Sequence, residues 1–193
     1  MSECYIVLGP PRTGTSLTMG VLAAMGIWTG DDFRRGRGNP CYYEDRDLYK
    51  FINAPSNAMA VVTKLATQPK WGFKHPRVLW LWDKLEPHIE SPHFVVTHRR
   101  NVEAHIASHR RQIRRQTPQA IKERTAKYYE GADKLRARYP VLDVWFEDYF
   151  EPGPRERQLH AMAAFCGMDV TDKARSLIDP RYRSDWHGRD AQR

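Results

Sequence analysis

The sequence predicts an α/β protein with three layers, α/β/α, around a mostly parallel central sheet. Short apolar runs rich in β-branched residues, typical of buried strands, alternate with segments whose apolar residues recur at helical spacing. The first apolar run leads directly into a glycine-containing loop and then a helical segment, the order found where a phosphate binds at a helix N-terminus. Such an alternation places helices on both faces of a parallel sheet.

Length and composition fit a single domain over residues 1–193. With 193 residues, of which 41% are hydrophobic, the chain is long enough to bury one sizeable core and needs no second domain. It contains no internal repeat and no low-complexity tract. Within this domain we expect a flexible loop at about 28–40 and a frayed tail at about 184–193.

The three cysteines and the N-terminal sequence indicate the cellular compartment in which we expect the protein. Cys4, Cys41 and Cys166 are odd in number and have no metal-ligand spacing, which favours a reducing compartment without disulfides or zinc. The first strand starts within four residues, which leaves no room for a signal peptide. No apolar run approaches the ~20 residues of a membrane helix. We therefore expect a cytoplasmic protein.

The chain is basic. A net charge of +8 and a pI near 9.5 indicate a surface that attracts polyanions. Nucleic acid, an acidic membrane and a nucleotide with several phosphates all satisfy this criterion, so charge alone does not choose among them.

The first motif is a phosphate loop, residues 9–16, between a strand over residues 4–8 and a helix to residue 25. Gly9 and Gly14 let the backbone turn several N–H groups toward one anion, and the helix dipole points at the same place. The hydroxyls of Thr15 and Ser16 add donors. Thr15 also stands where a nucleoside-triphosphate loop has its lysine, and Arg12 supplies the cation instead.

Residues 28–40 are rich in Gly and Arg and predict a loop that either covers the site or is a solvated connector. A helical segment follows over residues 42–52, with Glu44 near its first turn. With Asp45, Glu44 is placed to stabilise the helix N-terminus; a second interpretation of Glu44 comes from the resemblance described below. Residues 54–70 are ambiguous between helix and strand.

A short apolar strand over residues 71–73 ends in Lys74, His75, Pro76 and Arg77. Ligands of parallel α/β sheets bind at the carboxyl ends of strands, so Lys74 and His75 are candidate site residues. A histidine before a proline is also a common hydrogen-bonded turn residue, and both interpretations of His75 stay open.

Residues 78–85 predict a short helix packed by tryptophans, and residues 93–98 a buried central strand. The strand ends at Arg99 and Arg100. An amphipathic helix follows, with its apolar stripe predicted at Val102, Ile106, His109 and Ile113.

Thr117 and Pro118 form a helix-start signal for a long helix. Its buried stripe is predicted at Ile121, Thr125, Tyr128, Ala132, Leu135 and Tyr139, and its aromatics are assigned to the core. A strand is predicted over residues 141–146. It is followed by Glu147 and Asp148, which either hold Mg²⁺ or have a structural role. Residues 152–154 are expected to interrupt the chain before a helix that stops at Gly167.

In their order and spacing these motifs resemble those of the sulfotransferases that use 3′-phosphoadenosine 5′-phosphosulfate (PAPS). The loop with Arg12 resembles their 5′-phosphosulfate loop, and the cluster at Lys74 and His75 resembles two of their strand-end patterns. The segment from 99 to 108 resembles their 3′-phosphate site, in which an Arg is followed eight residues later by a Ser. Arg100 and Ser108 meet that spacing, whereas strand register favours Arg99.

The resemblance implies transfer of a sulfonate from PAPS to a hydroxyl or amine acceptor, with release of adenosine 3′,5′-bisphosphate (PAP) and no metal. It implies Arg12, with Lys74 second, as the cation at the leaving phosphate, and Glu44 or His75 as the base. The residues implied to bind PAPS come from the loop and the second phosphate site: Pro11, Arg12, Thr13, Gly14, Thr15, Ser16, Arg99, Arg100 and Ser108.

Three alternatives remain at this point. A nucleotide kinase or NTPase would use Glu147 and Asp148 for Mg²⁺. A non-catalytic nucleic-acid-binding module would use the arginines between 99 and 115 and show steep salt dependence. A third alternative is a sulfotransferase-like protein without activity. The sequence does not name the acceptor or the oligomeric state, and it makes a membrane partner unexpected.

Overall fold

A computed structural model describes residues 2–30, 67–75, 78–112 and 115–179. Its elements, in chain order, are β1 (Glu3–Leu8), α1 (Thr15–Met25), β2 (Lys70–Lys74), α4 (Val78–Leu85), the 3₁₀ turn η2 (Glu86–His88), β3 (Pro92–His98), α5 (Val102–Gln112), α6 (Pro118–Arg136), β4 (Val141–Trp145), the 3₁₀ turn η3 (Glu147–Phe150), α7 (Pro152–Cys166) and α8 (Asp172–Ser176). The helix predicted over 42–52, nearly all of the loop at 28–40 and the tail lie outside these residues.

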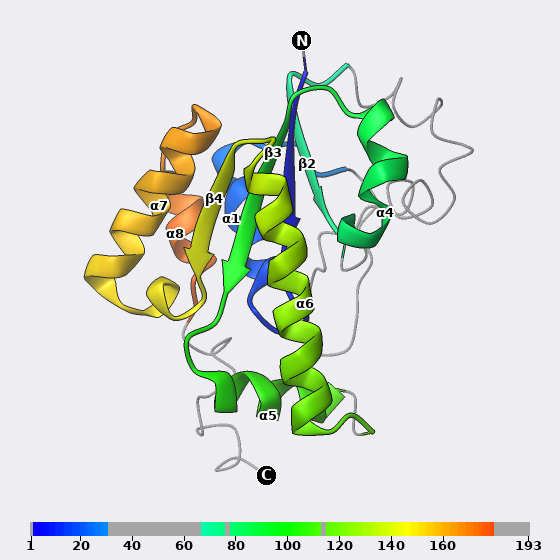
Figure 1. The fold of residues 1–193 in the computed structure, drawn as a ribbon. Helices are drawn as coiled ribbons and strands as arrows, with labels where there is room; N and C mark the ends of the chain where they lie inside the picture. Colours follow the sequence, from blue (N-terminus) through cyan, green and yellow to red (C-terminus); the bar gives the residue numbers. More distant parts are fainter. Residues whose placement is uncertain (1, 31–66, 76–77, 113–114, 180–193) are drawn as a thin grey trace.

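The four strands form one parallel sheet in the order β2-β1-β3-β4 (Figure 1). In the inner strand β1, Ile6 pairs with Phe73 on one side and with Phe94 on the other. β1 beyond Glu3 and the middle of β3 are apolar and buried because helices cover both of their faces. The predicted α/β/α class with a parallel sheet is confirmed.

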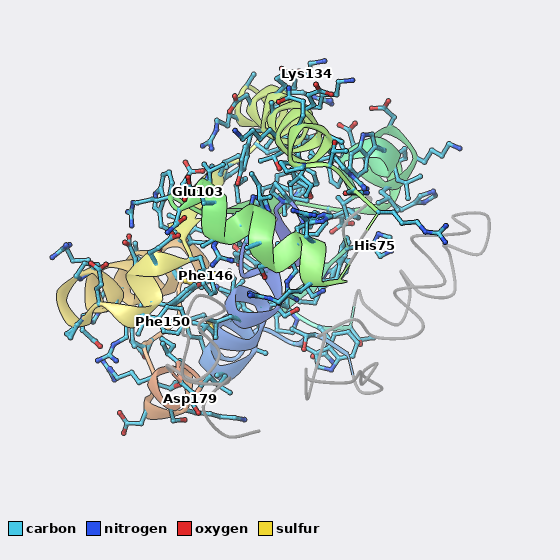
Figure 2. All side chains as sticks on the ribbon, turned by 90° about the horizontal axis from the view of Figure 1, so that it is seen from below. His75, Glu103, Lys134, Phe146, Phe150 and Asp179 are labelled. Atoms are coloured by element: carbon cyan, nitrogen blue, oxygen red, sulfur yellow. The ribbon has the colours of Figure 1, made fainter. Side chains whose placement is uncertain are left out.

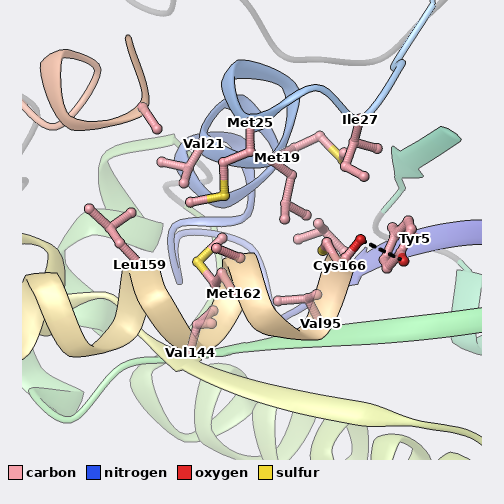
Figure 3. Close-up of a cluster of buried hydrophobic side chains, with 14 of the residues drawn as sticks. Tyr5, Met19, Val21, Met25, Ile27, Val95, Val144, Leu159, Met162 and Cys166 are labelled. Carbon is pink, nitrogen blue, oxygen red and sulfur yellow. Dashed lines mark hydrogen bonds between the residues drawn. The ribbon is translucent and has the colours of Figure 1, made fainter. Parts of the chain in front are cut away.

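Successive side chains of β1 point to opposite faces of the sheet and pack in two separate hydrophobic cores. Cys4, Ile6 and Leu8 pack with α4 and α6. Tyr5 and Val7 pack with α1, α7 and α8 in the cluster drawn in Figure 3. The strands are thus the middle layer, with α4 and α6 on one face and α1, α7 and α8 on the other.

Several predicted helix ends are confirmed. The hydroxyl of Thr117 accepts a hydrogen bond from the Ala120 N–H and caps α6, with Pro118 in the first turn. Gly26 and Gly167, both in the left-handed region, end α1 and α7.

One prediction about α7 was wrong. Pro152, Gly153 and Pro154 do not interrupt the chain ahead of this helix but form its first turn. Prolines fit there because the first N–H groups of a helix have no intrahelical carbonyl partner. A proline, which lacks this N–H, therefore removes no hydrogen bond from the helix.

The carboxyl ends of all four strands lie at the lower end of the molecule in Figure 1, and α5 crosses below them. The loop from β1 to α1 starts at this end, as does the turn from β3 to α5. The candidate residues of these loops therefore meet at one edge of the sheet. Within the described ranges, no helix has the length and apolar character needed to span a membrane.

Candidate phosphate-binding site

The phosphate loop turns sharply between β1 and α1. Gly14 has a φ of 94°, and Arg12, without being a glycine, has a φ of 76°. Positive φ at a non-glycine residue persists only where surrounding contacts hold it. The contacts that do so come from β3, α5 and α6.

The floor of the loop is bound to the sheet through two threonines. The Thr13 hydroxyl donates to the Pro10 carbonyl at 2.7 Å and lies 2.6 Å from the hydroxyl of Thr97 in β3. The Thr97 hydroxyl is in turn 3.1 Å from the Leu8 carbonyl. Thr13 is buried, so its side chain serves the loop's internal structure and does not line the loop's outer face.

A third support comes from α6. The Gly9 N–H donates to the hydroxyl of Tyr128 at 3.1 Å, and both residues are buried. Burial raises the pKa of Tyr128, so the phenol is neutral at physiological pH. The prediction that the aromatics of α6 belong to the core holds for Tyr128, but this residue also fixes the first glycine of the phosphate loop.

The loop ends at the N-terminus of α1. Thr15 and Ser16 are its first two residues and are partly exposed, and among the described residues neither hydroxyl has a hydrogen-bond partner. The first turn of α1 contains no acidic residue. The positive end of the helix dipole is therefore not offset by a carboxylate of its own turn.

Arg12 is held at both its backbone and its side chain. Its carbonyl accepts a hydrogen bond from Nη1 of Arg99 at 3.1 Å, and its own Nε donates to the Ser108 hydroxyl at 3.0 Å. Arg12, Arg99 and Ser108, which lie far apart in the sequence, thus meet at one point.

The two adjacent arginines at the end of β3 have different environments. The side chain of Arg99 is 1% exposed; its guanidinium lies over the Phe146 ring at 4.7 Å, and its Nε is 3.9 Å from Glu147. The side chain of Arg100 is 49% exposed, forms a two-pronged ion pair with Asp148 and stacks on Trp145. Of the two, Arg99 contacts the loop and Arg100 is accessible to solvent.

α5 turns a polar face toward the loop, which corrects the predicted apolar stripe. The buried residues of its described part are His105, Ser108 and His109, whereas Val102 is 48% exposed. The stripe fails because α5 packs on the phosphate loop and not on the apolar core. His105 Nε2 lies 2.9 Å from the Pro11 carbonyl.

The acidic residues after β4 are engaged with the β3–α5 turn. Glu147 accepts hydrogen bonds from the N–H groups of Arg100 and Asn101 at 3.1 and 3.2 Å, and Asp148 is paired with Arg100. No group of three or more residues of metal-ligating type gathers in the part of the chain that the structure describes. Here the two carboxylates hold a turn together.

Lys74 and His75 lie at the end of β2, and both are buried. Lys74 pairs with Val7, which places His75 level with the end of β1, just before the phosphate loop. In the view of Figure 2, His75 lies beyond one end of α5, and Phe146 lies between α5 and α7. Glu44, Pro76 and Arg77 fall outside the described residues.

Comparison with solved structures identifies this architecture. The sulfotransferase STF1 from Mycobacterium tuberculosis has a TM-score of 0.54 at 16% identity, over 92% of this chain and 71% of that one. The sulfotransferase domain of the Synechococcus olefin synthase has a TM-score of 0.56 at 17% identity, over 90% and 76%. The chain has the sulfotransferase fold.

A third structure with this fold is retinol dehydratase in complex with retinol and PAP, with a TM-score of 0.50 at 12% identity, over 94% of this chain and 65% of that one. No family model matches the sequence. No curated protein matches it significantly.

Within this sulfotransferase fold, the predicted loop residues, Arg99 and Ser108 come together, whereas Arg100 points to the acidic pair after β4. Sequence reasoning missed three supports of the loop, Thr97, His105 and the hydroxyl of Tyr128. A weak signal existed for the first two. Thr97 is a polar residue directly after the apolar run at residues 94–96, and His105 lies one helical turn before His109.

Proposed function

We propose that the protein transfers the sulfonate group of PAPS to a hydroxyl or amine acceptor and releases PAP. The observation that carries the proposal is the junction of Arg12, Arg99 and Ser108 beside the N-terminus of α1. A guanidinium, a hydroxyl and a helix N-terminus in one place suit a bound phosphate. The sulfotransferase fold supports the same reaction class.

In the proposed reaction the acceptor oxygen or nitrogen bonds to sulfur while the bond from sulfur to the bridging oxygen of the 5′-phosphate breaks. The electron pair of that bond leaves on the phosphate, where negative charge builds up. Arg12 and the amides of the phosphate loop are preorganised to meet this charge, with Lys74 as a second cation. In this role they replace a metal ion, and no metal is part of the proposal.

The acceptor must also lose a proton to a base. We assign this role to His75 or Glu44; the base must come within hydrogen-bond reach of the acceptor. His75 is supported by its place at the carboxyl end of β2, level with the start of the phosphate loop. Glu44 stays a proposal from the sequence alone.

For the 3′-phosphate we propose Arg100 as the contact and Arg99 as a support of the loop. Arg99 is almost fully enclosed and its donors face the Arg12 carbonyl and Glu147, whereas Arg100 is half exposed. The Arg100–Asp148 pair does not prevent this, because ion pairs in contact with solvent are worth only about 0–1 kcal/mol. A phosphate dianion can compete for the same guanidinium fork.

Calorimetric titration with PAP, 5′-AMP and Mg²⁺-ATP tests the proposal. We expect PAP to bind more tightly than 5′-AMP, without metal, and Arg100→Ala to remove most of that difference. Arg99→Ala should weaken all three nucleotides alike, because it loosens the loop that holds the 5′-phosphate.

Three results would change the assignment. Equal affinity for PAP and 5′-AMP would reject the sulfotransferase function. A preference for Mg²⁺-ATP would favour the kinase or NTPase alternative, and tight, steeply salt-dependent binding of long polyanions would favour a nucleic-acid module. If Arg99→Ala alone removes the preference for PAP, the two arginine roles are reversed.

We keep a cytoplasmic location as part of the proposal, supported by three cysteines without a paired spacing. Of these, Cys4 and Cys166 are buried thiols, and burial raises the pKa of both. Buried thiols of this kind are unreactive.

A further inference from the structure

We infer that Gln158 closes the outer edge of the sheet and thereby keeps a second copy of this chain from pairing its own β4 there. The inference rests on contacts between α7 and β4 and is independent of the proposed function. Among the described strands, β4 is the outermost on its side of the sheet. A strand in that position presents backbone N–H and C=O groups with which another strand can pair.

The backbone groups of β4 alternate between two directions. The Pro140 carbonyl accepts a hydrogen bond from the Phe94 N–H of β3. At the other end of the strand, the Phe146 N–H donates to the His98 carbonyl. Residues of a strand face its two neighbours alternately, so the even-numbered residues here face β3. The outward-facing residues of β4 are therefore Val141, Asp143 and Trp145.

Gln158 binds both backbone groups of one outward-facing residue. Its Oε1 accepts a hydrogen bond from the Trp145 N–H at 2.6 Å, and its Nε2 donates one to the Trp145 carbonyl at 3.2 Å. A primary amide offers a donor and an acceptor side by side, as a paired strand does. The side chain of Gln158 thus takes the place of a neighbouring strand at Trp145.

The surroundings of Gln158 in α7 show why a glutamine stands there. The residue is 7% exposed, and the other buried residues of this helix are apolar: Leu159, Met162, Ala163 and Cys166. A buried amide costs free energy unless it is hydrogen-bonded. Within the described part of the chain, both side-chain hydrogen bonds of Gln158 go to Trp145. Pairing the edge of β4 is therefore what distinguishes this residue from its apolar neighbours.

Closing one residue has a large effect because two identical strands pair symmetrically. An antiparallel pair that uses all three outward-facing residues of β4 would place the two Asp143 residues opposite each other and each Trp145 opposite a Val141. The bond to Gln158 therefore removes every residue pair of this register except the central one. A register shifted by two residues avoids Trp145 but also loses a pair. Neither leaves the length of ladder that a stable pairing needs.

The closed position lies next to the candidate site. Trp145 is the last residue of β4, and Phe146 and Glu147 follow it directly. Phe146 lies between α5 and α7 (Figure 2) and packs on Gly14, where a Cβ would come within 2.7 Å of its ring. Glu147 binds the β3–α5 turn. Gln158 therefore also fixes the strand end from which these two contacts reach the site.

The test compares Gln158→Met, which keeps the length of the side chain but has no amide, with His160→Ala on the exposed side of α7. Sedimentation velocity over a concentration series reports self-association. We expect Gln158→Met to form an additional species of twice the mass that grows with concentration, whereas the wild type and His160→Ala do not. In dilute solution its Trp145 amide should exchange hydrogen at least about tenfold faster than in the wild type, the equivalent of one lost hydrogen bond.

A second variant tests whether β4 is the surface involved. Asp143→Pro, added to Gln158→Met, removes an outward-facing N–H and blocks a further strand with its ring. An edge strand tolerates proline where the N–H faces away from the sheet. The double variant should return to the oligomeric state of the wild type. Association that persists in the double variant, or a Gln158→Met protein that does not associate, would overturn the inference.

A measurement on the wild type covers the case in which the variants do not fold, which circular dichroism detects. Trp145 and Asp143 both face outward, but of these two only Trp145 has an acceptor for its N–H in the described chain. We expect its amide to exchange at least about tenfold more slowly than that of Asp143. Equal exchange of the two amides would show that Gln158 does not close the edge.

Discussion

At the scale of single residues, Gly9 is a loop position with no room for a side chain. A Cβ there would lie 1.9 Å from the Thr97 hydroxyl and 2.6 Å from that of Thr13. These hydroxyls cannot move aside, because Thr13 binds the Pro10 carbonyl in the loop and Thr97 binds the Leu8 carbonyl at the end of β1. The glycine therefore serves close approach, since no positive φ is required at this residue.

We predict that Gly9→Ala lowers the free energy of unfolding by about 1–3 kcal/mol, the usual cost of forcing atoms into a packed site. Urea denaturation monitored by circular dichroism provides the measurement. Gly131→Ala is the matched control, because its Cβ would meet Leu79 at an ordinary 3.5 Å in the middle of α6. It should stabilise the protein by about 0.5–1 kcal/mol. Equal effects of the two changes would contradict this account.

At the scale of elements, α6 supports the phosphate loop as well as the core. Its buried stripe packs on the sheet, and from that stripe Tyr128 accepts the hydrogen bond of the Gly9 N–H. Because the apolar face of α6 is packed in the core, the position of the Tyr128 hydroxyl is fixed. The packing of α6 therefore also fixes the start of the loop.

We predict that Tyr128→Phe lowers the free energy of unfolding by about 1–3 kcal/mol, because the Gly9 N–H stays buried without an acceptor. It should also weaken PAP binding, and both effects can be measured by urea denaturation and calorimetry. Tyr139→Phe is the control, since its hydroxyl bonds to Glu86, a carboxylate still open to solvent. Its effect should stay within about 0.5 kcal/mol. A neutral Tyr128→Phe would show that water replaces the phenol.

At the scale of the whole molecule, buried histidines make stability depend on pH. Burial and neighbouring cations lower the pKa of His105 and of His109 in the folded protein. Below about pH 6.5, the ordinary histidine pKa, the unfolded chain therefore binds more protons than the folded one. The stabilisation is complete above that pH and declines as pH falls toward the lowered pKa values.

We predict that the free energy of unfolding rises between about pH 5 and pH 7, with a slope of at most about 1.4 kcal/mol per pH unit for each extra proton bound by the unfolded chain. The double variant His105→Gln, His109→Gln should have a flatter profile in that window, measured by urea denaturation at a series of pH values. An unchanged slope in the double variant would assign the dependence to other groups.

Local patterns were sufficient for most elements of the described chain. The first strand, the loop after it and the caps at Thr117 and Gly167 follow from side-chain periodicity and backbone preference, which depend on near neighbours in the sequence. The buried stripe of α6 is confirmed at Ile121, Tyr128, Ala132 and Leu135, whereas Thr125 is only partly buried and Tyr139 lies beyond the end of the helix. The stripe of α5 could not be predicted in the same way. The helical spacing of apolar residues identifies which residues share a face of the helix. It does not tell whether that face packs on an apolar core or on a polar loop.

The sequence by itself determined the α/β class, and it predicted the loop with Arg12 and a set of candidate site residues. Only the tertiary structure decided between Arg99 and Arg100 as the loop contact, brought Ser108 to Arg12, and placed Tyr128 and His105 against the loop. The physical reason is distance along the chain. These contacts join residues far apart in sequence, and their geometry exists only once the sheet has aligned the carboxyl ends of its strands.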